Sequence, residues 1–114
     1  MRVSALSIIL ALCAHLGCLI DVAEPSYTIV NPRLGLGVRL RWPLDVFPYA
    51  WFWQEVHASG GFPWFRRAYV TAIEPNTTPS AAGLSAVQAM GGTRMTLAGG
   101  ERRSATVELD VFAA

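Results

Sequence analysis

The strongest pattern in the sequence is an alternation of apolar and polar side chains. It is clearest in residues 36–42 and 105–111, where every second side chain is apolar and most of those between are arginine, threonine or acidic. Successive side chains of a strand point to opposite faces of a sheet, so this period of two is typical of strands buried on one face. The pattern predicts that residues 25–112 form antiparallel β-structure with at most one short helix.

Three more segments favour strands on other grounds. Residues 27–30 form a short extended piece between prolines, and residues 49–55 are rich in aromatic side chains that favour strands. A further strand is predicted at 67–74. It is predicted to end at Pro75, because proline has no backbone N–H to donate to a ladder.

The C-terminal third contains a helix signal and a hairpin signal. The apolar residues of 84–90 have helical spacing, and Gly91-Gly92 is predicted to end a short helix there. Residues 93–97 and 104–112 are predicted to pair as a hairpin around Gly99-Gly100. Together these patterns predict an all-β fold, an antiparallel β-sandwich.

Composition limits the partners of the chain. Its 114 residues allow one domain, and 53% hydrophobic against 15% charged residues argues for a folded chain. All nine basic residues are scattered arginines and the formal net charge is +1, so no basic stripe points to a nucleic acid. The two cysteines, Cys13 and Cys18, define neither a disulfide framework nor a metal motif. We expect no metal, no cofactor and no nucleic acid.

Residues 3–20 form an apolar run after Arg2. A basic start followed by such a run is typical of a secretory leader, and its length is near the lower limit for crossing a bilayer. The alternative is a truncated start that exposes a core segment of a longer protein. We therefore divide the chain into residues 1–22, a leader or truncated start, and the body, 23–114. The first alternative implies a secreted or membrane-anchored protein, and the second a cytoplasmic one.

Glu74 is the candidate catalytic residue. Alternation places Ala68, Val70 and Ala72 on its face, and these small side chains leave room for a ligand beside the carboxylate. A residue before proline is held extended, so Pro75 fixes the direction of Glu74. A fixed carboxylate can act as a general base. The alternative is a solvated or arginine-paired glutamate at a strand end.

The aromatic side chains suggest a ligand surface. Trp51, Trp53 and Trp64 offer flat apolar rings for the C–H faces of a sugar, and Gln54 and Glu55 could bind hydroxyl groups. Aromatic residues at alternate positions also fill the core of many sandwiches. Both interpretations are open at this point.

Two segments resemble the C-terminal part of the galactose mutarotase-like superfamily. They are RWPLDVFPYAWFWQE, residues 41–55, and GGFPWFRRAYVTAIEP, residues 60–75. The shared features are a tryptophan-rich strand ending in Gln-Glu, a Gly-Phe-Pro-Trp loop and a strand closing in Glu-Pro. The resemblance covers about residues 21–112. Within the superfamily, the chain resembles a bacterial branch related to aldose 1-epimerases.

The resemblance implies a fold and a reaction. Members fold as a large antiparallel β-supersandwich, of which this chain would be the C-terminal part, and bind sugars in a groove on one sheet. In aldose 1-epimerases a glutamate takes the proton from the anomeric hydroxyl and a histidine protonates the ring oxygen. Glu74 corresponds to that glutamate, and Trp53, Gln54 and Trp64 fall where the chain approaches the sugar. Neither His15 nor His57 matches the histidine, which lies upstream in the family.

We therefore expect carbohydrate binding, with an aldose or a derivative as the partner, by part of an aldose 1-epimerase-like isomerase. A general base without its acid gives little catalysis, so we do not expect the chain to be catalytic alone. One alternative is a secreted, non-catalytic carbohydrate-binding module. Another is a truncated gene product without independent function. A membrane partner is expected only if residues 3–20 are a true leader or anchor.

Overall fold

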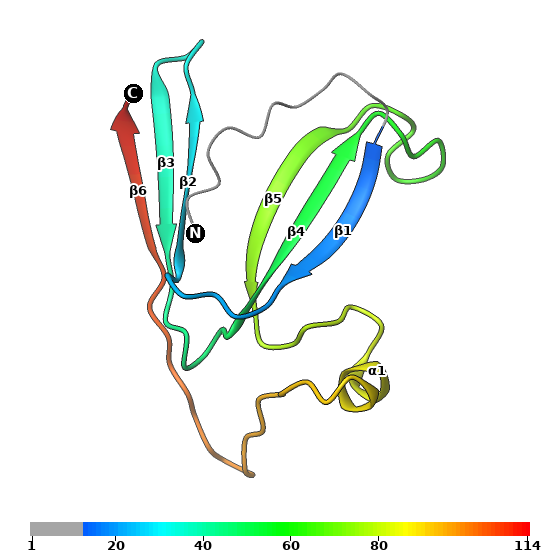
Figure 1. Ribbon diagram of the computed structural model, residues 1–114, viewed down its shortest axis with the longest axis vertical. Coiled ribbons are helices and arrows are strands. Elements are labelled where there is room, and N and C mark those ends of the chain that lie inside the picture. Colours follow the sequence, from blue (N-terminus) through cyan, green and yellow to red (C-terminus); the bar gives the residue numbers. More distant parts are fainter. Residues whose placement is uncertain (1–12) are drawn as a thin grey trace.

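The computed structural model describes residues 13–114 and contains two antiparallel three-stranded sheets and one short helix (Figure 1). Sheet A has the strand order β1-β4-β5, and sheet B has the order β2-β3-β6. The elements are β1 (Cys13–Leu19), β2 (Ser26–Asn31), β3 (Leu36–Arg41), β4 (Tyr49–Val56), β5 (Tyr69–Asn76), α1 (Leu84–Ala89) and β6 (Glu108–Ala113). The predicted all-β, antiparallel fold class is confirmed.

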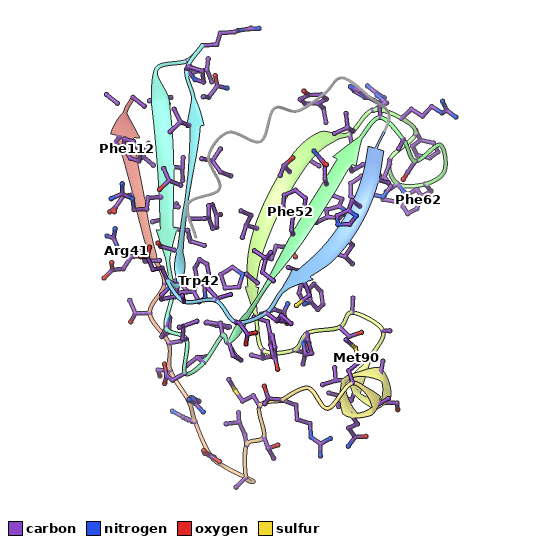
Figure 2. The ribbon with its side chains drawn as sticks, viewed as in Figure 1. Arg41, Trp42, Phe52, Phe62, Met90 and Phe112 are labelled. Carbon is purple, nitrogen blue, oxygen red and sulfur yellow. The ribbon has the colours of Figure 1, made fainter. Side chains whose placement is uncertain are left out.

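The two sheets meet near Trp42 and diverge from there (Figures 1 and 2). The Trp42 side chain is 5% exposed, and its ring nitrogen donates to the Phe47 carbonyl at 3.2 Å. Its backbone N–H donates to the Pro25 carbonyl at 3.0 Å, so Trp42 ties the segment before β2 to the segment after β3. A cleft of about 840 Å³ lies between the sheets, and Ala50 and Ile73 line its sheet A side.

Sheet B has one polar and one apolar face, as its alternation predicts. On the polar face Arg41 Nε lies 2.9 Å from Glu108 Oε2, and Arg41 Nη2 lies 2.8 Å from Asp110 Oδ2. These groups raise the pKa of Arg41, the hydrogen bond to Glu108 most of all. All three side chains are largely solvated, so the pairs fix register more than they add stability.

The apolar face of sheet B carries cross-strand rows of aliphatic and aromatic side chains. Ile29, Val38 and Val111 form one row, and Tyr27, Leu40 and Leu109 form the next. Several of these side chains face solvent, with Leu109 62% and Val111 65% exposed. This face is not covered by any other element that the structure describes.

The apolar run of the sequence contributes a strand. Cys13–Leu19 form β1, which pairs with β4 over seven residues, from Cys13 opposite Val56 to Leu19 opposite Ala50. Residues 1–12, on which the choice between a leader and a truncated start also depends, lie outside the described residues. Within residues 13–114, the one helix is far too short to cross a bilayer.

The predicted end of β5 at Pro75 is wrong, since the strand continues to Asn76. The backbone N–H of His57 donates to the Ala68 carbonyl, which makes this a hydrogen-bonded pair of the β4–β5 ladder. Hydrogen-bonded and non-hydrogen-bonded pairs alternate in antiparallel ladders, so the pair Ala50–Pro75 is non-hydrogen-bonded. The Pro75 nitrogen therefore points away from β4 toward the outer edge, and no ladder bond is lost.

The C-terminal predictions had mixed outcomes. The short helix is confirmed as Leu84–Ala89, with Val87 buried and Gly91 at a φ of 67° beyond its end. The hairpin around Gly99-Gly100 is wrong. A turn forms there, with the Glu101 N–H donating to the Ala98 carbonyl at 3.0 Å, but residues 93–97 form no strand. Strand β6 pairs with β3 instead.

Candidate functional site

Four of the six predicted site residues share one face of sheet A. Strand β4 places Trp51, Trp53 and Glu55 on this face, which we call the outer face. In the register of β4 with β5, Trp51 lies opposite Glu74, and Trp53 lies opposite Ala72. The opposite face carries Ala50 and Ile73 and borders the cleft between the sheets, so the outer face points away from that cleft.

Trp64 joins this face from the loop between β4 and β5. Its ring centroid lies 5.1 Å from that of Trp53, with the ring planes tilted by 44°. Trp64 is 36% exposed, so part of the ring remains open to solvent. The loop, residues 57–68, also carries Phe62, which is 86% exposed (Figure 2). Trp53 and Trp64 form the aromatic pair of the candidate site.

Glu74 is exposed and stands next to the aromatic pair. Trp51 is directly across the ladder from Glu74 and Trp53 is its diagonal neighbour, so two tryptophan positions adjoin Glu74 on this face. The small side chain of Ala72 lies on the same face as Glu74, as alternation predicts. Glu74 lines neither of the two clefts that border sheet B.

Glu55 has a different environment. Only 2% of it is exposed, and its Oε1 accepts hydrogen bonds from the backbone N–H groups of Ala58 and Ser59, both at 2.9 Å. The Ser59 hydroxyl donates to Oε2 at 2.6 Å. These bonds, led by that of the Ser59 hydroxyl, hold the pKa of Glu55 below its usual value. The carboxylate is therefore engaged by its own loop.

Trp51 and Gln54 lie on opposite faces of sheet A. The ring nitrogen of Trp51 donates to the Thr78 carbonyl at 2.8 Å, which joins β4 to the segment after β5. Gln54 is on the opposite face from Trp51 and Trp53, because side chains alternate along β4. The structure thus brings together Glu74, Trp51, Trp53 and Trp64, and separates Gln54 from them.

The two histidines are not near Glu74. His15 pairs with Gln54 across the ladder, on the opposite face, and its ring centroid lies 6.0 Å from that of Phe52. His57 Nδ1 lies 2.9 Å from the Arg66 carbonyl, and His57 follows Trp51, the partner of Glu74, by six positions along the chain. Six residues of a strand span roughly 20 Å. Within the part of the chain that the structure describes, no cluster of three metal-ligating side chains occurs.

No curated protein and no solved structure has a significant match to the chain. One family does, and its matching region, residues 21–111, includes both sheets except β1 and the last two residues of β6, together with the whole aromatic pair and Glu74. The chain therefore belongs to the family described as a domain of unknown function, DUF4432.

Proposed function

We propose that the chain binds a sugar on the outer face of sheet A, as the C-terminal part of an aldose 1-epimerase-like protein. The observation that carries the proposal is the aromatic pair, Trp53 and Trp64 at 5.1 Å, next to an exposed carboxylate on the same face. The residues of the family resemblance, 41–55 and 60–75, are those that build this arrangement.

The chemistry of the face suits a sugar. A pyranose has apolar C–H faces that pack on indole rings, and hydroxyl groups that donate to a carboxylate. Trp53 and Trp64 supply the rings, and Glu74, an exposed residue, supplies an acceptor. Ala72 lies opposite Trp53 and takes little space, so a ring-sized ligand could approach both Trp53 and Glu74.

The proposed role of Glu74 is that of the general base. In an anomer exchange it would take the proton from the anomeric hydroxyl, while an acid protonates the ring oxygen. His15 lies on the other face and His57 lies roughly 20 Å along the strand, so neither can reach the same sugar ring as Glu74. In this proposal the acid comes from another part of the larger protein.

A non-catalytic sugar-binding module is the second candidate. It is favoured by the same observation, because an aromatic pair and an exposed acid are sufficient for binding without any acid partner. The two candidates differ in turnover but share the binding surface, so a binding experiment tests both.

The experiment is a titration of the purified chain with glucose and galactose, followed by tryptophan fluorescence and calorimetry. Trp64→Ala removes half of the aromatic pair, and we expect it to weaken binding by roughly tenfold, the worth of one aromatic stacking contact. Phe62→Ala is the matched control, since Phe62 belongs to the same loop, is 86% exposed and lies outside the pair. Equal affinity for Trp64→Ala and the unmodified chain would contradict the proposed surface.

A further inference from the structure

Glu55 is the one buried charged side chain among residues 13–114 that the structure describes. It lies near the end of β4, one residue before the strand gives way to the loop 57–68. Burying a carboxylate is costly unless charged or polar partners compensate for the lost water. A residue of this kind needs a structural or functional reason.

The compensation comes entirely from the loop. The N–H groups of Ala58 and Ser59 and the hydroxyl of Ser59 donate three hydrogen bonds to the Glu55 carboxylate. No arginine forms an ion pair with it in the described chain. Hydrogen bonds to an ionised acceptor are stronger than neutral ones, so these three bonds hold the first part of the loop on β4.

Backbone hydrogen bonds connect Ser59 to the part of the loop that carries Trp64. The Ser59 carbonyl accepts from the Arg66 N–H at 2.8 Å, which clamps the two sides of the loop together. Within this clamp the Gly61 carbonyl accepts from the Trp64 N–H at 3.0 Å. The loop is thereby closed around Trp64, whose ring lies on that of Trp53.

We infer that Glu55 is a positioning residue, which holds the loop 57–68 so that Trp64 lies on Trp53 and completes the aromatic pair. Glu55 does not contact the sugar, because its carboxylate is buried and already accepts three hydrogen bonds. This changes the role predicted for it from sequence, and its consequence for sugar binding rests on the proposed function.

The first experiment needs no sugar. Two indole rings at 5.1 Å produce an exciton couplet in the far-ultraviolet circular dichroism spectrum, and Trp64→Phe defines that signal by removing it. Glu55→Gln keeps the shape of the side chain and Ser59→Ala removes one donor. We expect both to lose most of the couplet, and Ser59→Thr, which keeps the hydroxyl, to retain it. The couplet of each variant is compared with that of the unmodified chain at a temperature where the two have the same β-sheet signal. Differences in the couplet then do not come from unfolding.

A full couplet in folded Ser59→Ala and Glu55→Gln overturns the inference. If Glu55→Gln does not fold, Ser59→Ala against Ser59→Thr decides in the same way, since these variants leave the carboxylate in place.

The second experiment repeats the sugar titration with the same variants. If the variants that lose the couplet also bind the sugar roughly tenfold more weakly, the positioning role is supported. A lost couplet with unchanged affinity overturns the link between Glu55 and the sugar. If the unmodified chain binds no aldose, the proposed function fails, and the couplet alone still decides whether Glu55 positions Trp64.

Discussion

The two acidic side chains of the outer face, Glu55 and Glu74, have opposite environments although they lie on adjacent strands. Glu55 is buried under its loop and bound by three donors, whereas Glu74 is exposed beside Trp51. The buried carboxylate is suited to fixing structure and the exposed one to meeting a ligand.

Glu74→Gln keeps the size and polarity of the side chain but removes the base. Within an aldose 1-epimerase-like protein that turns over, we expect sugar binding to survive and turnover to fall by roughly 10²-fold or more. The measurement is polarimetry per folded molecule, beside a thermal melt. A structural glutamate would instead lower stability and leave turnover per folded molecule unchanged, which would remove Glu74 from the mechanism.

Glu55 should make the stability of the chain depend on acid pH. Its pKa in the folded chain is lowered from the ordinary 4.5, above all by the Ser59 hydroxyl. A lowered pKa means that the folded state binds the proton less tightly than the unfolded state. The contribution of Glu55 is therefore fully present above 4.5 and is lost as pH falls through the lowered pKa.

The measurement is the melting temperature from neutral pH down to below pH 4.5, with Glu55→Gln as reference. We expect the difference between the two chains to shrink as the solution becomes more acid. If the difference in melting temperature between the two chains stays constant across this range, the charge of Glu55 does not stabilise the loop. His57, which lies within the same loop and also favours the ionised carboxylate, stays in place in both chains.

At the scale of elements, strands were predictable and their partners were not. Alternation in 36–42 and the aromatic segment 49–55 located β3 and β4 closely, because side-chain period is a local property. The predicted partner of β6, residues 93–97, was wrong, because Gly99-Gly100 suggested a local hairpin. Strand β6 pairs with β3 across 67 residues, where Arg41 meets Glu108. Such pairing depends on matching side chains from distant segments, which a local pattern does not contain.

The site shows the same division. Trp53, Trp64 and Glu74 were predictable as candidates from residue type, and alternation places Trp53 and Glu74 on their strands. The pairing of Trp64 with Trp53 was not predicted, because it depends on the course of the loop. The loop role of Glu55 was missed, because a glutamate in an alternating strand has the same pattern whether its carboxylate contacts a ligand or its own backbone. The one available signal was Ser59, four residues later in a glycine-rich turn, a typical donor to such a carboxylate.

Gly37 tests the pairing of β3 with β6. A Cβ at this buried position would collide with the ring of Phe112, its partner on β6. We expect Gly37→Ala to displace that ring and destabilise the chain by about 1–3 kcal/mol, the usual cost of overpacking. Gly61→Ala is the control, because a Cβ there meets nothing within 4 Å. Thermal unfolding of both variants gives the comparison, and equal melting temperatures would contradict the pairing.

At the scale of the whole molecule, the chain is more open than its length implies. Its radius of gyration is 16.3 Å, whereas a compact domain of this length has roughly 13 Å. The two sheets diverge, and few large apolar side chains of the described residues, 13–114, are buried. A small core supports limited stability, so we expect the isolated chain to unfold at modest temperature.

The apolar face of sheet B should bind the hydrophobic dye ANS in the folded state. Val111 on that face is 65% exposed, and Val30 on the opposite face is 48% exposed, which makes the two residues a matched pair. We expect Val111→Thr to lower dye fluorescence clearly and Val30→Thr to change it little. Similar losses in both variants would mean that the dye binds elsewhere.

The isolated chain should not accelerate anomer exchange. It has a candidate base in Glu74, but His15 is on the opposite face and His57 is roughly 20 Å away along the strand. Polarimetry of freshly dissolved glucose and galactose, with and without protein, measures this directly. A clear acceleration by the pure chain would show that an acid acts from within it.

The outward-facing nitrogen of Pro75 has a consequence for association between molecules. An exposed strand edge is a template on which the strand of another molecule can pair, and this is how many β-proteins aggregate. Along β5, the position of Pro75 offers no donor to an incoming strand, so edge-to-edge growth of sheet A is interrupted there. The other edge of the sheet, β1, carries no proline within Cys13–Leu19. Intermolecular pairing on sheet A should therefore begin at β1, and a strand added at β5 would be held by an interrupted ladder.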